Sequence, residues 1–368
     1  MTQLRVGIDA TPLAGRRTGV GRYLEGVLGG LRDLGSPIDP VLSVFSARRA
    51  TVPRADLVGA RRAPLRAPAR LLQALWARTD LPPVEWLTGR IDVFHATNFV
   101  LPPTRGAGVL TIHDLAYLRH ADTVSQASAR YRTLVPRGIG RARLVICFTE
   151  AVRTEICDAY DVDPVRVRVI PHGVDPGWAR AVAPTERQLS AWGLPPRYLV
   201  AVGTVEPRKN LGMLIAGHAA ARRQRIDVPP LVLIGGPGWG APFGGVQPDP
   251  ADVSMVGYLS DERLRAVLAG ADALCMPSRY EGFGLPLLET LAAGRPVLAS
   301  DIAAHREVGA DAAQYVAMDT GAWAEAITGL ATHGPQTSVA QRRARATAFT
   351  WRRSAQAHLQ TYRDAIDS

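Results

Sequence analysis

A chain of 368 residues exceeds the usual size of one compact core, so we expect two domains. It contains no run of about 20 uncharged apolar residues, which excludes a membrane-spanning helix, and its three isolated cysteines exclude a disulfide framework. The formal net charge of +10 favours anionic partners, but no zinc-finger, RNA-recognition or helix-turn-helix pattern occurs. We therefore expect no nucleic-acid partner. The first residues form no signal-peptide pattern, so we expect a cytoplasmic protein.

Strand-like and helix-like segments alternate along the chain. In the first half, apolar stretches predict buried strands at 5–9, 93–97, 108–114, 143–148 and 166–175. In the second half, they predict strands at 197–204, 230–236, 253–259, 271–278 and 295–301. Apolar strands separated by helices indicate parallel sheets covered on both faces. We therefore predict an α/β protein with two doubly wound, Rossmann-like domains and a linker near 176–190.

The loop after the first strand contains Gly19 and Gly21 and leads into a helix expected from about Arg22. Glycines let the backbone approach a ligand closely, and a helix N-terminus attracts anions. The third glycine of a dinucleotide-binding fingerprint is missing. A tight turn without a ligand is therefore an equally good interpretation.

Residues 47–78 carry eight arginines and one acidic residue. Within them Leu71, Leu72, Leu75 and Trp76 are expected on one helical face. One interpretation is a peripheral contact with an anionic membrane surface. The other is a solvated basic loop whose apolar stripe packs on the core.

His113 and Asp114 follow the apolar strand predicted at 108–114. Ligands of doubly wound folds bind beyond the carboxyl ends of the strands, so His113 is a candidate substrate contact. The alternative is a histidine whose hydrogen bonds are satisfied by the neighbouring backbone.

Lys209, in the stretch VGTVEPRKN, is the only lysine of the chain. A compact ammonium suits a phosphate oxygen in a tight site, whereas a guanidinium is a rigid planar fork. Lys209 and the adjacent Arg208 are therefore candidates for binding phosphate. Chance retention in an arginine-rich chain is the alternative.

The stretch SRYEGFGLPLLETL gives the strongest signal. Glu281 lies in a glycine-rich loop after a predicted strand, and Glu289 lies on the helix that the loop opens. Pro286 suits the first turn of that helix, and free N–H groups are expected near Gly284 and Leu285. Two carboxylates flanking a helix N-terminus suit a nucleotide sugar, with one for the ribose, one for the sugar and N–H groups for the diphosphate.

These motifs resemble glycosyltransferase family 4, whose members are retaining enzymes with the two-domain GT-B fold. EGFGLPLLE is similar to the family's E-x7-E motif and VGTVEPRKN to its phosphate-binding motif. TGVGRY, TIHDL and HGVD stand where the family has its glycine loop, its N-domain histidine and its linker. Within the family, the motif sequences most resemble those of bacterial mannosyltransferases of polysaccharide or glycolipid synthesis. Some relatives carry an arginine where this chain has Thr204, so the phosphate contacts are expected to depend more on Arg208 and Lys209.

The resemblance implies the roles of the site residues. Glu281, His113, Arg208 and Lys209 would be catalytic: Arg208 and Lys209 on the leaving diphosphate, Glu281 on the donor sugar, and His113 near the anomeric centre. The residues Gly19, Gly21, Phe283, Gly284, Leu285 and Glu289 would bind substrate, with Glu289 on the ribose. It also implies a GT-B arrangement of an N-terminal acceptor-side domain at 1–180 and a nucleotide-sugar domain at 181–347, facing across a cleft, with a helix at 348–368 that returns to the first domain.

No cofactor and no metal are expected. The stretch DVD at 161–163 has the spacing of a metal site in another glycosyltransferase fold, but it lies far from the candidate loops, and we interpret it as a surface turn. The expected partners are a nucleotide-diphosphate sugar and a sugar or lipid-linked acceptor. Alternatives are a sugar-nucleotide epimerase or hydrolase on the same fold, or a non-catalytic binding protein. A glycosidase is less favoured, because its two carboxylates must flank the sugar.

Overall fold

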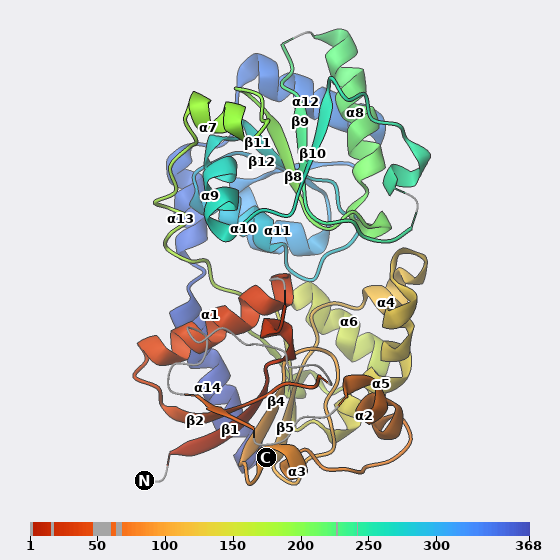
Figure 1. Cartoon of the computed structure of the whole chain (residues 1–368), viewed down its shortest axis with the longest axis vertical. Coiled ribbons are helices and arrows are strands. Elements are labelled where there is room, and N and C mark those ends of the chain that lie inside the picture. The colour runs from red at the N-terminus through yellow and green to blue at the C-terminus, as the bar shows by residue number, and fades with distance from the viewer. Residues whose placement is uncertain (1–2, 16–17, 47–59, 64–67, 226, 241) are drawn as a thin grey trace. The chain divides into compact units, whose positions relative to one another are not determined.

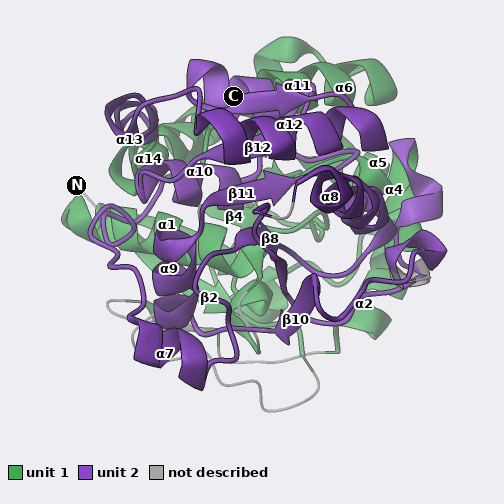
Figure 2. Ribbon diagram, turned by 90° about the horizontal axis from the view of Figure 1, so that it is seen from above, with its two compact units in different colours: residues 1–118, 126–173, 349–368 green, residues 119–125, 174–348 purple. Residues whose placement is uncertain are grey.

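The computed structural model describes residues 3–15, 18–46, 60–63, 68–225, 227–240 and 242–368. Contacts within the chain divide it into two compact units (Figures 1 and 2). Unit 1 comprises 1–118, 126–173 and 349–368, and unit 2 comprises 119–125 and 174–348. The chain passes into unit 2 at residue 174, seven residues before the boundary expected at 181, and returns to unit 1 at residue 349. No helix of the described residues is long and apolar enough to cross a bilayer.

Unit 1 contains a seven-stranded parallel sheet in the order β3-β2-β1-β4-β5-β6-β7. The strands are β1 (Leu4–Asp9), β2 (Ile38–Ser43), β3 (Arg61–Arg62), β4 (Val93–Ala96), β5 (Ala107–Thr111), β6 (Leu144–Cys147) and β7 (Val167–Val169). β4 and β6 are buried along their whole length, because helices cover both faces of a parallel sheet. The strand order reverses between β1 and β4, so this pair marks the topological switch point where doubly wound folds bind ligands.

The helices of unit 1 are α1 (Gly19–Asp33), α2 (Ala69–Trp76), α3 (Glu85–Thr88), α4 (Ala116–Arg119), α5 (Tyr131–Arg141), α6 (Glu150–Tyr160) and the C-terminal α14 (Trp351–Asp367). α1 and α14 pack closely because α1 presents glycines at the contact. A Cβ atom on Gly26 would come within 2.2 Å of the Trp351 indole, and one on Gly30 within 2.4 Å of the Trp351 carbonyl oxygen. The C-terminal helix is therefore built into unit 1.

A buried polar network joins α14 to α1 and the sheet. His358 Nδ1 donates to the Ser354 carbonyl at 2.8 Å, so its Nε2 accepts from the Tyr23 hydroxyl at 2.8 Å. His95 lies 2.8 Å from the Tyr362 hydroxyl through Nδ1 and 2.7 Å from the Thr111 hydroxyl through Nε2. The neutral His358 ring thus has both nitrogens satisfied. Burial lowers its pKa to about 4.

Unit 2 contains a six-stranded parallel sheet in the order β10-β9-β8-β11-β12-β13. The strands are β8 (Leu199–Val202), β9 (Leu231–Ile234), β10 (Val253–Gly257), β11 (Ala273–Met276), β12 (Val297–Ser300) and β13 (Gln314–Val316). The helices are α7 (Glu186–Ala191), α8 (Leu211–Gln224), α9 (Asp261–Gly270), α10 (Leu285–Ala292), α11 (Ala303–Gly309), α12 (Thr320–His333) and α13 (Val339–Thr347). α8 and α12 pack side by side over a core that includes Leu214, Trp323 and Leu233 (Figure 1). The sheet order reverses between β8 and β11.

All ten predicted strands are present, but the sequence missed β2, β3 and β13. The helix expected from Arg22 begins earlier, at Gly19, so Gly19 and Gly21 lie in its first turn rather than in a loop. Most of the basic stretch 47–78, including 47–59 and 64–67, lies outside the described residues.

The prediction that Leu71, Leu72, Leu75 and Trp76 share one face of α2 is wrong. Leu72 and Trp76 are 6% and 1% exposed, whereas Leu71 and Leu75 are 65% and 49% exposed. Residues one position apart on a helix point about 100° away from each other. The helix therefore packs one pair on the core and presents the other pair at the surface.

The histidine network predicts that unit 1 loses stability in acid. Because burial lowers the folded-state pKa of His358 from 6.5 to about 4, its stabilising contribution is complete above about pH 6.5 and falls as the pH drops toward 4. This one group is expected to cost about 3 kcal/mol of unfolding free energy by about pH 4. Burial lowers the pKa values of His95, His113 and His172 in the same direction. Urea titrations across this range should show a shallower pH slope in His358→Gln than in the wild type, and an unchanged slope would contradict the assignment.

Candidate functional site

The loops that follow β8 and β11 meet at the switch point of unit 2. β8 and β11 are hydrogen-bonded neighbours and run parallel, so their carboxyl ends lie at one edge of the sheet. The loop after β8 contains Arg208 and Lys209, and the loop after β11 contains Glu281. The Arg279 amide donates to the Arg208 carbonyl at 2.9 Å, which joins the two loops through their backbones. The sequence-predicted residues Arg208, Lys209 and Glu281 are thus brought together.

The loop after β8 is shaped by a short turn of 3-10 helix at Pro207–Lys209. Pro207 suits its first position, and Asn210 ends it in the left-handed conformation, with φ 55°, before α8 begins. The aliphatic stem of Lys209 crosses Gly203, where an added Cβ would lie 3.2 Å from the Lys209 Cε. A glycine at the end of β8 therefore allows Lys209 to lie flat across the loop and to reach Glu281.

Glu281 forms a buried ion-pair cluster with both cations. Its Oε1 accepts from Lys209 Nζ at 2.6 Å and its Oε2 from Arg208 at 2.9 Å. Burial alone would raise the pKa of the Glu281 carboxyl, but the charges of Lys209 and Arg208 outweigh burial and hold that pKa far below its usual range. Glu281 is therefore an ionised carboxylate that fixes two cations at the switch point.

Further buried side chains make hydrogen bonds to this cluster or lie beside it. Glu206, 8% exposed, accepts from the other arm of Arg208 at 2.6 Å, and the Ser278 hydroxyl donates to Glu281 Oε1 at 2.7 Å. His305 on α11 is fully buried, and its Nδ1 donates to the Ser300 carbonyl at 3.0 Å. Its Nε2 has no hydrogen-bond partner among the described residues and faces Gly284, where a Cβ would lie 3.7 Å away. Burial lowers the pKa of His305, so the ring is neutral near pH 7.

The N-terminus of α10 lies directly after Glu281. Gly284 caps the helix with φ 97°, a left-handed conformation that favours glycine, and Pro286 stands in the first turn. Phe283 and Leu285, two predicted site residues, are 4% and 9% exposed, so little of either residue is open to solvent. Glu289 is also buried, one turn into α10.

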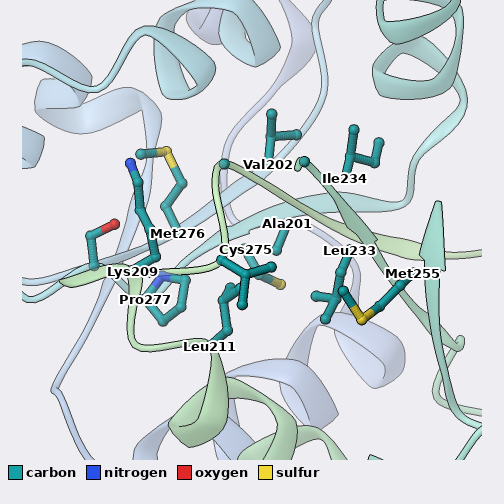
Figure 3. Close-up of a pocket in the computed structure, with 14 residues that line it drawn as sticks. Ala201, Val202, Lys209, Leu211, Leu233, Ile234, Met255, Cys275, Met276 and Pro277 are labelled. Carbon is teal, nitrogen blue, oxygen red and sulfur yellow. The ribbon is translucent and has the colours of Figure 1, made fainter. Parts of the chain in front are cut away.

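A narrow pocket lies under this edge of the sheet (Figure 3). Lys209 and Pro277 line one side, and Leu233 and Met255 line the other. Its volume of about 10 Å³ is room for about one water molecule. The pocket is therefore too small for a nucleotide, and a ligand of that size would bind over the loops rather than inside it.

The predicted residues Gly19, Gly21 and His113 belong to unit 1. His113 Nε2 donates to the carbonyl of Thr97, which follows β4, at 2.8 Å, and its ring packs edge-on against Tyr23 at 5.4 Å. Burial lowers the pKa of His113. Within the described part of the chain, a Cβ on Gly19 would meet no atom within 4 Å.

The DVD stretch is a surface turn, as predicted. Asp161 ends α6 in the left-handed conformation, and the Asp163 carboxylate accepts from the Val165 amide at 2.9 Å. Among the residues with described coordinates, no group of three or more His, Cys, Asp or Glu side chains is placed to hold a metal ion.

Sequence reasoning missed Glu206, His305 and Asp9. Glu206 had a local signal, because it stands two residues before Arg208 in the same short loop. Asp9 ends β1 at the switch point of unit 1. Burial raises the pKa of its carboxyl to about 6, although a hydrogen bond from the Thr11 amide lowers that pKa in part. His305 had no signal, because its position under Gly284 depends on how α11 packs.

Comparisons with known proteins agree with this architecture. Residues 17–178 match the family described as Glycosyltransferase Family 4, and residues 196–333 match the one described as Glycosyl transferases group 1. O-antigen chain mannosyltransferase B of Escherichia coli is 28% identical over 238 residues, which are 60% of each chain, so the chain spans less than two thirds of that relative. D-inositol 3-phosphate glycosyltransferase of Kineococcus radiotolerans is 29% identical over 321 residues, covering 76% of this chain and 70% of that one.

Solved structures share the fold. Sucrose-phosphate synthase from Thermosynechococcus elongatus aligns with a TM-score of 0.73 at 18% identity, covering 99% of both chains. Anabaena HepE, solved in complex with UDP and glucose, aligns with a TM-score of 0.71 at 17% identity, covering 99% of this chain and 100% of that one. The predicted α/β fold of the GT-B class, with two Rossmann-like domains, is confirmed.

The buried cluster predicts strong coupling between Glu281 and Lys209. Removing one partner of a buried ion pair leaves an uncompensated charge and costs about 3 kcal/mol or more. Glu281→Gln and Lys209→Met should each destabilise unit 2, and the double variant should lose at least about 1 kcal/mol less than the sum. The exposed pair Arg197–Asp272, at 2.8 Å, is the control and should couple by less than about 1 kcal/mol. If urea titrations showed that the two variants lose unfolding free energy additively, Glu281 and Lys209 would not be energetically coupled.

Proposed function

Because the chain belongs to glycosyltransferase family 4, we propose that it transfers a sugar from a nucleotide-diphosphate donor to an acceptor hydroxyl, with retention of the anomeric configuration. The observation that carries the proposal is the pair of cations that buried Glu281 fixes beside the N-terminus of α10. Such a layout binds a diphosphate and stabilises it as a leaving group.

Lys209 is the group we assign to the donor diphosphate. Its ammonium has three N–H donors, and Glu281 accepts one of them at 2.6 Å. Within the described residues the structure gives Lys209 no other polar partner, so two donors remain for phosphate oxygens. Arg208 is committed to Glu206, to Glu281 and to the Tyr280 carbonyl, and therefore supplies charge from a fixed position. As the bond between the sugar and the diphosphate breaks, negative charge grows where these cations lie.

The carboxylates take different roles in this proposal. Glu281 orients Arg208 and Lys209, and as an ionised group it accepts hydrogen bonds from the donor sugar and stabilises developing positive charge. Glu289 on α10 binds the ribose. The course is front-face attack through an oxocarbenium-like state, in which the leaving phosphate helps to take the acceptor proton.

The residues of unit 1 complete the assignment. Gly19 and Gly21, in the first turn of α1, are assigned to the donor phosphates, which is supported by the open space that a Cβ on Gly19 would enter. His113 is assigned to the sugar near the anomeric centre. Its Nε2–H is held by the Thr97 carbonyl, so in the neutral ring Nδ1 carries the lone pair.

For the substrates, we propose mannose from GDP-mannose and an acceptor of cell-envelope polysaccharide or glycolipid synthesis, used in the cytoplasm or at the inner membrane surface. The E. coli relative, a mannosyltransferase of O-antigen chains, supports mannose and such an acceptor. The Kineococcus relative, named for D-inositol 3-phosphate, supports a small phosphorylated acceptor instead. Thermal-shift measurements with UDP, GDP, ADP and their sugars separate the donors, and a shift with GDP and GDP-mannose alone is expected.

The central test of the proposed function is the loss of donor binding in Lys209→Ala. A charge-assisted contact of this kind is worth about 1.5–3 kcal/mol, so nucleotide-sugar affinity should fall at least about tenfold and transfer should be lost. Lys209→Arg should also be impaired, because a planar fork does not replace a point charge. Calorimetric titration with the donor measures the binding. In the same measurement Glu289→Gln should weaken binding of the nucleoside diphosphate alone as much as binding of the full donor, because Glu289 is assigned to the ribose. Wild-type affinity in Lys209→Ala would refute the phosphate role.

Transfer is expected to proceed without a divalent metal, because Arg208 and Lys209 supply the positive charge that a metal would otherwise provide. The measurement is the initial rate of transfer after treatment with EDTA and gel filtration, against an untreated sample. Equal rates are expected. A loss that Mg²⁺ or Mn²⁺ restores would show that the two cations are insufficient.

A further inference from the structure

Glu206 is a buried acid beside the two cations of the candidate site. Its Oε1 accepts from Arg208 Nη2 at 2.6 Å, and its side chain is 6% exposed. Glu206 stands at the N-cap of the short turn Pro207–Lys209, where an acidic side chain often accepts from a backbone N–H, but it makes no such bond. Its backbone carbonyl accepts from the Lys209 amide at 3.0 Å instead. The side chain therefore serves Arg208 and not the local turn.

The Arg208 guanidinium is held in place without Glu206. Its Nη1 donates to the Tyr280 carbonyl at 2.7 Å and to Glu281 Oε2 at 2.9 Å. Because the guanidinium is planar, two acceptors on one arm fix the direction of the other arm as well. A neutral amide oxygen at the position of the Glu206 carboxylate would accept from Nη2 with the same geometry. The negative charge of Glu206 therefore adds an effect beyond holding the guanidinium.

That charge balances the cluster electrically. Salt bridges join the carboxylates of Glu206 and Glu281 to the cations Arg208 and Lys209, so the formal charges of these four groups cancel. All four side chains are at most 15% exposed, and water therefore screens their charges little. Without the charge of Glu206, the same cluster would carry a net positive charge at the switch point.

A balanced cluster affects the two diphosphates of the reaction to different extents. Cations that stabilise the leaving diphosphate also hold the nucleoside diphosphate once the sugar has been transferred. The free nucleoside diphosphate carries more negative charge than the nucleotide sugar does. A fixed negative charge beside Arg208 therefore weakens binding of the product more than binding of the donor. Release of the product becomes easier, while the cations stay where the donor needs them.

We propose that Glu206 is a counter-charge that limits the affinity of this site for the free nucleoside diphosphate and so promotes its release after sugar transfer. Glu206 acts through Arg208, whose charge it partly cancels, and is therefore a positioning residue. The inference rests on the proposed function, since that function places a diphosphate beside these cations. The alternative is an ion pair that only stiffens the loop. In that case, removal of the charge would loosen Arg208 and weaken binding of a diphosphate.

The two interpretations predict opposite signs for Glu206→Gln, which keeps the size and the acceptor oxygen of the side chain but removes its charge. Calorimetric titration of the full-length protein with inorganic pyrophosphate and with GDP measures the affinity. Glu206→Gln should bind both probes at least about threefold more tightly than the wild type. Glu206→Asp keeps the charge and should not bind more tightly. Glu186→Gln, which removes the same charge from an exposed position on α7, is the matched control and should bind as the wild type does.

A second set of variants tests the counter-charge in a protein without Arg208. Arg208→Gln should weaken pyrophosphate binding, because one cation is lost and the charge of Glu206 is left uncompensated. The double variant Glu206→Gln/Arg208→Gln should regain at least about threefold of that affinity. A residue that only holds Arg208 has nothing to hold in this background. A double variant that binds no better than Arg208→Gln would therefore contradict the counter-charge.

Release is measured directly by stopped-flow fluorescence, with GDP that carries an N-methylanthraniloyl group as the probe. Its dissociation rate constant should be lower in Glu206→Gln than in the wild type and in Glu186→Gln, and an equal rate constant would refute the role in release. If the wild type binds pyrophosphate or GDP and Glu206→Gln binds no more tightly, the inference alone fails. If the wild type binds neither probe, the proposed donor function fails, and the inference fails with it.

Discussion

The buried carboxylate of Glu281 sets the constraint on which unit 2 depends. A charge of this kind remains ionised in a protein interior only when partners compensate for lost hydration. Here the partners are Lys209 and Arg208, which come from the loop of the neighbouring strand. The acid therefore cannot be buried unless β8 and β11 bring their carboxyl ends together. One interaction thus ties the strand order of the sheet to the placement of two cations.

The same constraint applies at position 209, where the only lysine of the chain stands. Arg208 spreads its fork over Glu206, Glu281 and the Tyr280 carbonyl, which uses its donors in fixed directions. A second guanidinium at position 209 would have to fit the space between Gly203 and Glu281, where the lysine stem passes 3.2 Å from an imagined Cβ. A thin, flexible chain ending in a point charge fits there. Among the described residues the arginine is fixed by three protein partners, whereas the lysine ammonium has a hydrogen bond to Glu281 alone.

The sequence was sufficient where the signal is local. Periodicity predicted ten of the thirteen strands among the described residues, and the motif sequences predicted the family, which the comparisons confirm. It missed β2 because Asp39 and Pro40 weaken a strand pattern. The α2 stripe was misjudged because adjacent leucines cannot share a helix face. The position of His305 under Gly284 depends on tertiary packing, which no window of sequence contains.

The arginine excess of the chain also becomes interpretable once pairing is known. In unit 2, Arg222, Arg197 and Arg306 lie against aspartates, so their charges are compensated by the fold. Other exposed arginines of the described residues have no carboxylate within salt-bridge distance, among them Arg90 and Arg105 in unit 1 and Arg187 and Arg223 in unit 2. The excess of positive charge is therefore spread over the surface of both units, as an arginine-rich composition produces, and does not by itself mark an anion site in either unit.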